Sequence, residues 1–141
     1  MKSIKLYYTV NVERLYGRTV KILNSLGIPH TDIYLKKGSE LLTKETVKYL
    51  LECSEYGFRD ILVNTEAVNQ ILRNEKYTTN DVIDMVIDNP KMLRPLILIG
   101  RVRNTTIMLT GVHTDIDNYT VFLPREREMS RYHDRASYCN S

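Results

Sequence analysis

The sequence has little cysteine, no tryptophan and no long hydrophobic run. Its two cysteines, Cys53 and Cys139, lie far apart in a chain of 141 residues and have no metal-binding or redox-motif spacing. A disulfide scaffold is therefore not expected, and Cys53, which continues a helical pattern, is expected to pack in the interior. No apolar stretch approaches the ~20 residues that span a bilayer, which argues against a transmembrane segment.

The composition and charge balance are typical of a globular domain. Hydrophobic residues make up 43% of the chain, charged residues 26%, and the formal net charge is +3. Charges of both signs are interspersed, so the balance is too weak to indicate direct binding of nucleic acid. The first residues, Met-Lys-Ser-Ile-Lys, lack the apolar core of a secretory signal. We therefore expect a cytoplasmic protein of one domain with no membrane partner.

The start of the chain predicts a strand, a helix and a second strand. Apolar residues alternate over 4–9, as expected for a strand that is covered on one face. Asn11 can cap the following helix, and Gly27 can end it because glycine adopts a positive φ without steric cost. Pro29 keeps the helix from resuming, and residues 30–36 fit a second strand. If the two strands are parallel neighbours, their connection is right-handed.

The segment 37–92 is predicted to be an insertion of short helices packed beside a small sheet. Its apolar residues recur at helical spacing, and Thr43 can cap the first helix through its hydroxyl group. The other boundaries that the sequence predicts are a break at 55–58, a helical stretch over 61–72, a cap at Thr79 or Asn80 and an end at Asn89-Pro90.

The sheet is predicted to resume after this insertion. Residues 95–100 form a continuous apolar run of strand type, and residues 106–109 can pair with them as a hairpin through a turn at 102–104. A last helix is predicted over 115–122. The mixed-charge residues 126–141 are expected to form a polar tail.

Several short motifs carry a resemblance to a known family. They are Leu-Gly-Ile-Pro at 26–29, Leu42-Thr43-Lys44-Glu45, Gly57, Asn89-Pro90, Arg94-Pro95-Leu96-Ile97-Leu98 and Phe122-Leu123-Pro124-Arg125. Because these motifs occur together, in the order and near the spacing of the family, the chain resembles the Spx family of transcriptional regulators, in the arsenate-reductase-like branch of the thioredoxin superfamily. The resemblance covers roughly residues 4–125 and implies an α/β fold, a thioredoxin-like mixed four-stranded sheet (βαβ…ββα) with an inserted helical subdomain. It implies a single domain over 1–125, with the insertion at about 37–92.

The resemblance also implies a function. Members of the Spx family bind the C-terminal domain of the RNA polymerase α subunit and redirect transcription in the response to thiol stress. Their contact surface includes the region around a glycine that matches Gly57, so a polymerase-binding surface is implied at Tyr56, Gly57 and Phe58. Contact with DNA is then expected only indirectly, through the polymerase complex. No cofactor is implied, and the three histidines show no metal-ligand spacing.

The sequence departs from this family at the positions of its redox switch. The family's Cys-x-x-Cys falls on Glu13 and Tyr16, at a helix N-terminus that would favour a thiolate. The arginine of the family's Thr-Arg-Ser element falls on Glu66, and one of the two arginines before the proline is Leu93, while Arg94 remains. We therefore expect a redox-insensitive relative that is not an enzyme, because the thiol nucleophile of the related reductases is absent.

The degenerate redox position has two interpretations. Glu13 can simply complement the helix dipole, or it can replace a thiolate with a permanent anion that holds one signalling state. Its partner would be Arg94, which is expected to lie with Pro95 in a pocket beside the first helix. In thioredoxin-like folds the matching proline follows a cis peptide bond, so the resemblance implies a cis bond before Pro95. The alternative is an ordinary proline at the start of a strand.

Two further expectations concern glycine and tyrosine. Gly57 is expected to end a helix with a positive φ, and this is compatible with a flat spot that a partner protein can approach. The ten tyrosines are spread over different elements and form no evident stripe, so they are expected to pack half-buried rather than stack on nucleic acid.

Two other functions remain open. One is an arsenate-reductase-like enzyme, or a glutathione-linked oxidoreductase, that has altered chemistry and binds an anion near Arg94. The other is a competitor that occupies the same polymerase surface without activating promoters. Binding to the isolated α-subunit domain separates the enzyme from the two regulators, and promoter activation in vitro separates the regulators from each other.

Overall fold

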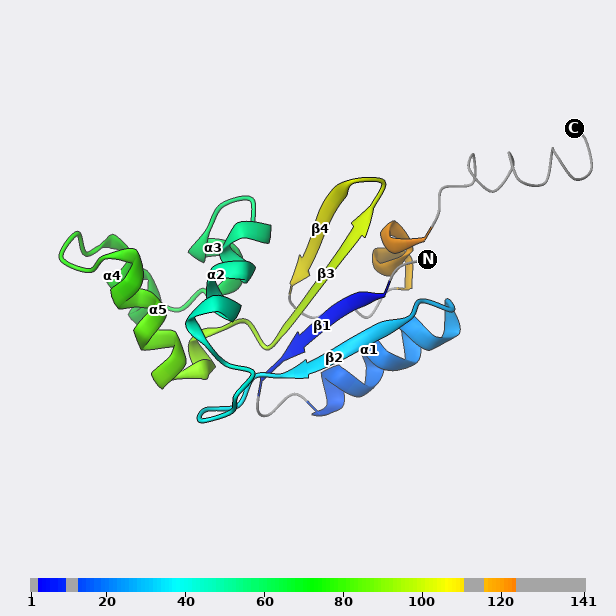
Figure 1. Cartoon of the computed structure of the whole chain (residues 1–141), viewed down its shortest axis with the longest axis horizontal. Coiled ribbons are helices and arrows are strands. Elements are labelled where there is room, and N and C mark those ends of the chain that lie inside the picture. Colours follow the sequence, from blue (N-terminus) through cyan, green and yellow to red (C-terminus); the bar gives the residue numbers. More distant parts are fainter. Residues whose placement is uncertain (1–2, 10–12, 111–115, 124–141) are drawn as a thin grey trace, which may run out of the picture.

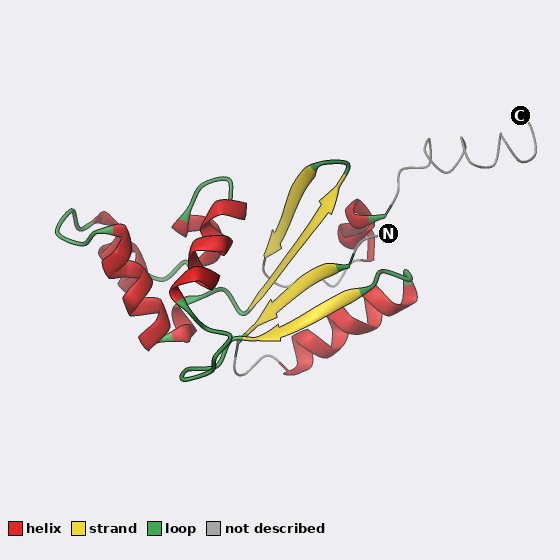
Figure 2. Cartoon of the chain, viewed as in Figure 1, coloured by secondary structure: helices red, strands yellow, loops and turns green. Residues whose placement is uncertain are grey.

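The computed structural model describes residues 3–9, 13–110 and 116–123 (Figure 1). One sheet lies at the centre of the molecule, with α1 against one face and four further α-helices grouped beside it (Figure 2). The first unit is the predicted strand, helix and strand: β1 (Ile4–Tyr8), α1 (Glu13–Ser25) and β2 (His30–Tyr34).

The sheet has four strands in the order β2-β1-β3-β4. β1 and β2 are parallel, whereas β3 (Leu96–Val102) pairs antiparallel with both β1 and β4 (Thr105–Thr110). This confirms the mixed four-stranded sheet that the sequence predicts. A two-residue turn joins β3 to β4, and both of its residues, Arg103 and Asn104, have positive φ.

The end of α1 follows the predicted chemistry. Gly27 has a φ of 68°, and its N–H group donates to the carbonyl of Asn24 at 3.1 Å. The N–H group of Ile28 donates to the carbonyl of Leu23 at 2.9 Å, which completes a Schellman motif. The chain therefore leaves the helix in the direction that starts β2.

The sheet separates two hydrophobic cores. Successive residues of a strand point to opposite faces, so β1 and β3 each contribute to both. Leu6 and Leu98 pack with α1 and with η2 (Ile116–Phe122), while Tyr7 and Ile97 pack with the helices between β2 and β3. Leu96 to Gly100 in β3 are buried throughout, which explains its continuous apolar run.

Three of the five helical elements between β2 and β3 begin at threonine caps. Thr43, Thr65 and Thr78 each accept a backbone N–H group with the side-chain oxygen. Thr78, rather than the predicted Thr79 or Asn80, caps the last α-helix. The Asp81 carboxylate accepts the Thr78 N–H group, and the Thr78 hydroxyl accepts the Asp81 N–H group, which together form a capping box. These elements are α2 (Lys44–Cys53), α3 (Phe58–Ile61), α4 (Glu66–Arg73), α5 (Thr79–Asp88) and η1 (Pro90–Met92).

Other boundaries differ from the sequence expectations. The predicted helical stretch over 61–72 is divided into α3 and α4, because Leu62 leaves the helix and forms an isolated antiparallel bridge with Leu93. The last helix is a 3₁₀ helix, η2, in which Tyr119 is fully buried. Asn11, the expected cap of α1, and the tail 126–141 lie outside the described residues.

Candidate functional site

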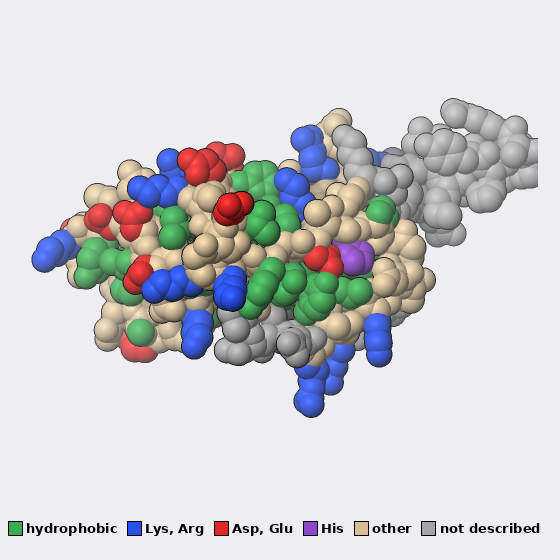
Figure 3. Space-filling view, turned by 60° about the horizontal axis from the view of Figure 1, so that its bottom comes forward, with side chains coloured by type: hydrophobic (Ala, Val, Ile, Leu, Met, Phe, Trp, Pro, Cys, Tyr) green, Lys and Arg blue, Asp and Glu red, His purple; other side chains and the backbone are tan. Residues whose placement is uncertain are grey.

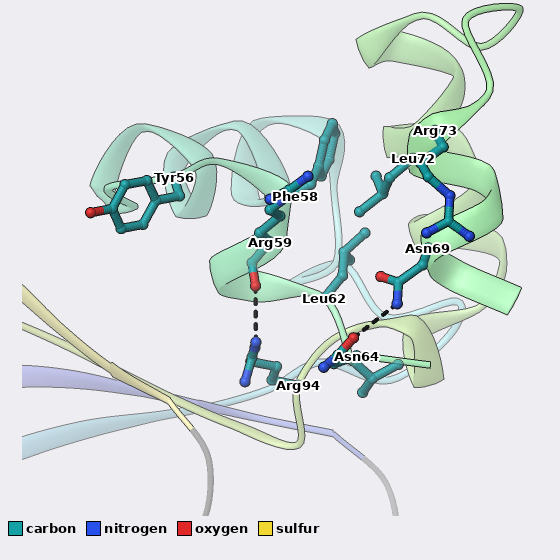
Figure 4. A pocket seen from close by; sticks show the side chains of 10 residues that line it. Tyr56, Phe58, Arg59, Leu62, Asn64, Asn69, Leu72, Arg73 and Arg94 are labelled. Atoms are coloured by element: carbon teal, nitrogen blue, oxygen red, sulfur yellow. Dashed lines mark hydrogen bonds between the residues drawn. The ribbon is translucent and has the colours of Figure 1, made fainter. Parts of the chain in front are cut away.

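A cleft of about 590 Å³ opens between α3 and α4 (Figure 4). Its side chains are of two kinds, basic or amide groups and apolar groups, and no acidic residue lines it. The arginines come from three different segments, namely α3, α4 and the residue before Pro95. The lining residues are Arg59, Arg73, Arg94, Asn64 and Asn69, together with Tyr56, Phe58, Leu62, Val63 and Leu72.

The Leu62–Leu93 bridge brings Arg94 into this cleft. The Arg94 N–H group donates to the carbonyl of Ile61 at 2.8 Å, and the Val63 N–H group donates to the carbonyl of Met92 at 2.8 Å. The Arg94 guanidinium then donates through Nη2 to the carbonyl of Arg59 at 2.9 Å. Figure 4 shows this bond running from Arg59 to Arg94, on the side of the cleft away from Arg73. The guanidinium is therefore oriented by one backbone carbonyl.

The loop before α3 presents the predicted contact residues. Gly57 has a φ of 71°, which confirms the expected positive value, and a Cβ atom built on it would meet no atom within 4 Å. The loop does not end α2 as expected, because Ser54 caps that helix and Gly57 precedes α3. The Tyr56 side chain is 70% exposed. A partner could therefore approach the backbone at Gly57 closely.

Two side chains hold this loop in one conformation. A single oxygen of Asp60, Oδ2, accepts the N–H groups of Glu55 and Tyr56 at 2.7 and 2.8 Å. The Ser54 hydroxyl accepts the N–H group of Gly57 at 3.0 Å. Three consecutive backbone donors are thus satisfied within the loop, so the Tyr56 backbone is fixed before any partner binds.

The structure joins two sites that the sequence treats separately. Arg94 lies in the same cleft as Tyr56 and Phe58. Pro95 does not line this cleft; its carbonyl accepts the N–H group of Thr9 at 3.1 Å. The expected cis bond is wrong, because every peptide bond of the described residues, including Arg94–Pro95, is trans.

The expected pair between Glu13 and Arg94 remains a prediction. Glu13 is the first residue of α1, and its side chain lies outside what the structure describes. Arg94 bonds the carbonyl of Arg59 instead of any described carboxylate.

Tyr16, the other degenerate redox position, belongs to a stack of three tyrosines. The rings of Tyr8 and Tyr16 are 4.3 Å apart between centroids, and those of Tyr8 and Tyr34 are 5.0 Å apart. The expectation that the tyrosines form no stripe is therefore wrong for these three. Tyr8 and Tyr34 are register partners at the carboxyl ends of the parallel strands β1 and β2, and Tyr16 lies in the first turn of α1.

Asp32 ties this stack to the edge strand. Its carboxylate accepts the Tyr16 hydroxyl through Oδ2, and Oδ1 lies 2.5 Å from Nδ1 of His30. The hydrogen bond to Asp32 raises the pKa of Tyr16 to about 12, so this hydroxyl stays protonated at alkaline pH values where a free tyrosine ionises. Figure 3 shows the histidine beside an acidic side chain on a face where charges of both signs are interspersed. A protonated phenol is a poor nucleophile, so the Tyr16 hydroxyl does not replace the thiolate of a redox motif.

Cys53 belongs neither to the cleft beside Arg94 nor to the tyrosine stack. It is partly buried and packs with α2 against the core that contains Tyr7. It is not among the residues that line the cleft beside Arg94. Burial raises the pKa of Tyr7 to about 12.

The described residues hold no group of histidine, cysteine and carboxylate side chains suited to a metal ion, and none of their helices is long and apolar enough for a membrane span.

The strand order and the helices inserted between β2 and β3 define an arsenate-reductase-like, thioredoxin-like α/β fold. Solved structures share it. An arsenate reductase (ArsC) related protein from Brucella melitensis superposes with a TM-score of 0.52 over 86% of this chain and 94% of its own, at 15% identity. A protein described as YffB superposes with a TM-score of 0.56 over 86% of this chain and 99% of its own, also at 15% identity.

The sequence itself is similar to a regulatory protein. It is 36% identical over 62 residues to the regulatory protein MgsR of Bacillus subtilis (strain 168). The match covers 43% of this chain and 49% of that protein, so the chain spans about half the length of this relative. No model of a known protein family matches the sequence. The chain therefore combines an arsenate-reductase-like fold with weak homology to a regulatory protein.

Proposed function

We propose that this protein is a redox-insensitive, Spx-like transcriptional regulator that binds the C-terminal domain of the RNA polymerase α subunit. The observation that carries the proposal is the loop at Tyr56, Gly57 and Phe58. Its backbone is fixed by Asp60 and Ser54, the Tyr56 side chain is exposed, and the space over Gly57 is open. A preformed surface of this kind loses little conformational entropy when a partner binds.

Two further observations support a regulator over an enzyme. The similarity to a regulatory protein comes from sequence, whereas the likeness to an arsenate reductase related protein is a likeness of fold. In addition, Glu13 and Tyr16 stand at the start of α1 where the resemblance places the redox cysteines, the Tyr16 hydroxyl bonds Asp32 of β2, and Cys53 does not line the cleft beside Arg94. Contact with DNA would then follow from the polymerase complex, in keeping with a net charge of only +3.

The test is a calorimetric titration of the isolated α-subunit domain with two arginine variants. Gly57→Arg is expected to abolish binding because the new side chain fills the approach to the loop. Gly38→Arg is the matched control, since Gly38 also has a positive φ, of 84°, and open space over its Cα. Each variant is expected to lose about 1–3 kcal/mol of stability from backbone strain. Equal binding by both variants would contradict the proposed surface.

A competitor that blocks the polymerase surface without activating promoters would bind through the same loop. Transcription in vitro separates it from an activator, because only the activator raises the yield of transcript from a responsive promoter. The sign of regulation follows from this measurement, whereas the binding surface follows from the titration.

A further inference from the structure

The cleft between α3 and α4 has a charge arrangement that the loop at Gly57 does not explain. Three arginines line it without an acidic residue. The Nε atom of Arg94 is buried and has no hydrogen-bond partner among the described residues. Buried donors without a partner are uncommon in folded proteins and call for a ligand group or a water.

The other two arginines can add to this positive charge. Arg59 is exposed and forms no ion pair with any residue in the described ranges. Arg73 is paired with Glu66 at 3.0 Å, but both side chains are largely exposed, so the pair is solvated and free to rearrange. Arg94 is thus the partly buried arginine of the cleft, and Arg59 and Arg73 are the exposed ones.

Apolar side chains share the same space. Phe58, Leu62 and Leu72 line the cleft beside the arginines, and Asn69 donates to Asn64 at 2.9 Å along one wall. A volume of about 590 Å³ lies in the range of pockets that hold several linked groups. The cleft continues to the exposed ring of Tyr56, which also lines it. A ligand with an anionic part and an apolar part would therefore contact both the arginines and the apolar side chains of the cleft.

We propose that this cleft binds an acidic side chain, together with a neighbouring apolar side chain, from a short segment of a partner protein. Arg94 takes the carboxylate, and the apolar side chain packs on Phe58 and Leu72. The planar guanidinium suits a carboxylate because its N–H groups match the two oxygens. The inference rests on the proposed function in one respect, since it makes the cleft a continuation of the surface at Gly57.

The test uses the full chain, labelled with nitrogen-15, and short peptides as probes. The peptide acetyl-Asp-Leu-Asp-Leu-amide is expected to shift the backbone resonances of Phe58, Arg59 and Arg94. Acetyl-Asn-Leu-Asn-Leu-amide, which lacks charge, and acetyl-Asp-Ser-Asp-Ser-amide, which lacks the apolar part, are each expected to bind at least about tenfold more weakly. Equal binding of all three peptides, or shifts outside the cleft only, would overturn the inference.

Variants identify the arginines that act. Arg94→Gln is expected to lower the affinity for the acidic peptide by at least about tenfold. Arg59→Gln, at an exposed position, keeps the test valid if the first variant folds poorly, and it is expected to weaken binding by about threefold. Arg18→Gln on α1 removes the same charge from an exposed position and is expected to change nothing. Equal effects of all three would overturn the inference, as would inorganic phosphate that displaces the peptide at an equal concentration.

The same variants separate this inference from the proposed function. If the α-subunit domain fails to bind but the acidic peptide binds in the cleft, the proposed function fails and the cleft inference stands. If the domain binds through Gly57 and Arg94→Gln leaves its affinity unchanged, the cleft inference fails and the proposed function stands.

Discussion

A few hydrogen bonds set the position of the loop at Gly57 and of the Arg94 side chain. One oxygen of Asp60 accepts two backbone N–H groups, from Glu55 and Tyr56, and so fixes the loop that carries Gly57. One carbonyl, that of Arg59, orients the guanidinium of Arg94. Neither contact follows from residue type alone, because both depend on where the chain turns before and after α3.

Removing the Asp60 carboxylate is expected to loosen the loop. Asp60→Ala leaves the N–H groups of Glu55 and Tyr56 without their acceptor, and we expect a loss of about 1 kcal/mol in the free energy of unfolding. Affinity for the α-subunit domain is expected to fall as well, since the loop must be ordered on binding. Urea unfolding and calorimetry measure the two effects. Asp60→Asn keeps an acceptor oxygen and should lose less; a larger loss in that variant would contradict the account.

The tyrosine pKa values make stability depend on alkaline pH. Tyr16 and Tyr7 both have a pKa raised to about 12, the first by the hydrogen bond to Asp32 and the second by burial. An unfolded tyrosine titrates near pH 10, so the contribution of each protonated hydroxyl is complete below about pH 10 and is lost as the pH rises through 12. The free energy of unfolding is therefore expected to fall across this window.

The variant Tyr16→Phe isolates one of the two groups. Its unfolding free energy, measured by urea titration at several pH values between about 9 and 11, is expected to fall less steeply than that of the natural chain. Tyr77→Phe is the control, because the Tyr77 side chain is exposed and its ring lies outside the tyrosine stack. A slope for Tyr16→Phe equal to that of the natural chain would show that Asp32 does not hold the Tyr16 proton.

At the scale of elements, close packing joins η2 to the sheet. Gly100 in β3 leaves room for Ile4 of β1 and for the ring of Phe122. A Cβ atom at Gly100 would lie 2.7 Å from Ile4 Cγ2 and 2.7 Å from Phe122 Cδ1. Glycine is needed here for space, not for its backbone freedom, because no positive φ is found at this position.

Gly100→Ala is therefore expected to displace η2 and to lower the free energy of unfolding by about 1–3 kcal/mol. Gly17→Ala is a matched control in α1, where a Cβ atom meets nothing within 4 Å and the backbone is helical. It should raise stability by about 0.5–1 kcal/mol, because alanine favours the helix. Thermal unfolding of both variants checks the pair. A stabilised Gly100→Ala variant would refute the close packing of Phe122.

Local patterns predict most elements of this fold. The alternation of β1, the apolar run of β3, Gly27 and the Thr43 cap each act within a few residues, so sequence reveals them. The predicted cap, Thr79 or Asn80, lies one or two residues after the observed cap at Thr78. All three residues are good caps, and only the partner Asp81 selects among them.

Long-range contacts made the candidate site less predictable. The Leu62–Leu93 bridge joins segments from either side of α4 and α5, and this bridge places Arg94 beside Phe58. The tyrosine stack depends on the parallel register of Tyr8 with Tyr34, which no local pattern fixes. The sequence analysis named residues of both the cleft and the tyrosine stack, but it did not predict which of them lie close together.

At the scale of the whole molecule, the two halves have separate cores and separate roles in the proposal. The half with α1 holds the tyrosine stack and packs Leu23 and Leu98, while the half with α2 to α5 packs Leu50 and Ile83 and carries the cleft. Cys53 directly precedes Ser54, but the hydrogen bonds that hold the loop at Gly57 come from the side chains of Ser54 and Asp60 and not from the thiol, so oxidation of Cys53 is expected to leave the loop unchanged. Regulation by this protein would then follow its abundance rather than the redox state of the cell.

The most direct test of the central claim is a calorimetric titration of the α-subunit domain with the full chain, reduced by dithiothreitol in one sample and oxidised by diamide in the other. A matched titration with Cys53→Ser detects any effect of that thiol. The account predicts that the domain binds and that the two dissociation constants agree within about twofold. Absence of binding, or a change of about tenfold or more on oxidation, would contradict it.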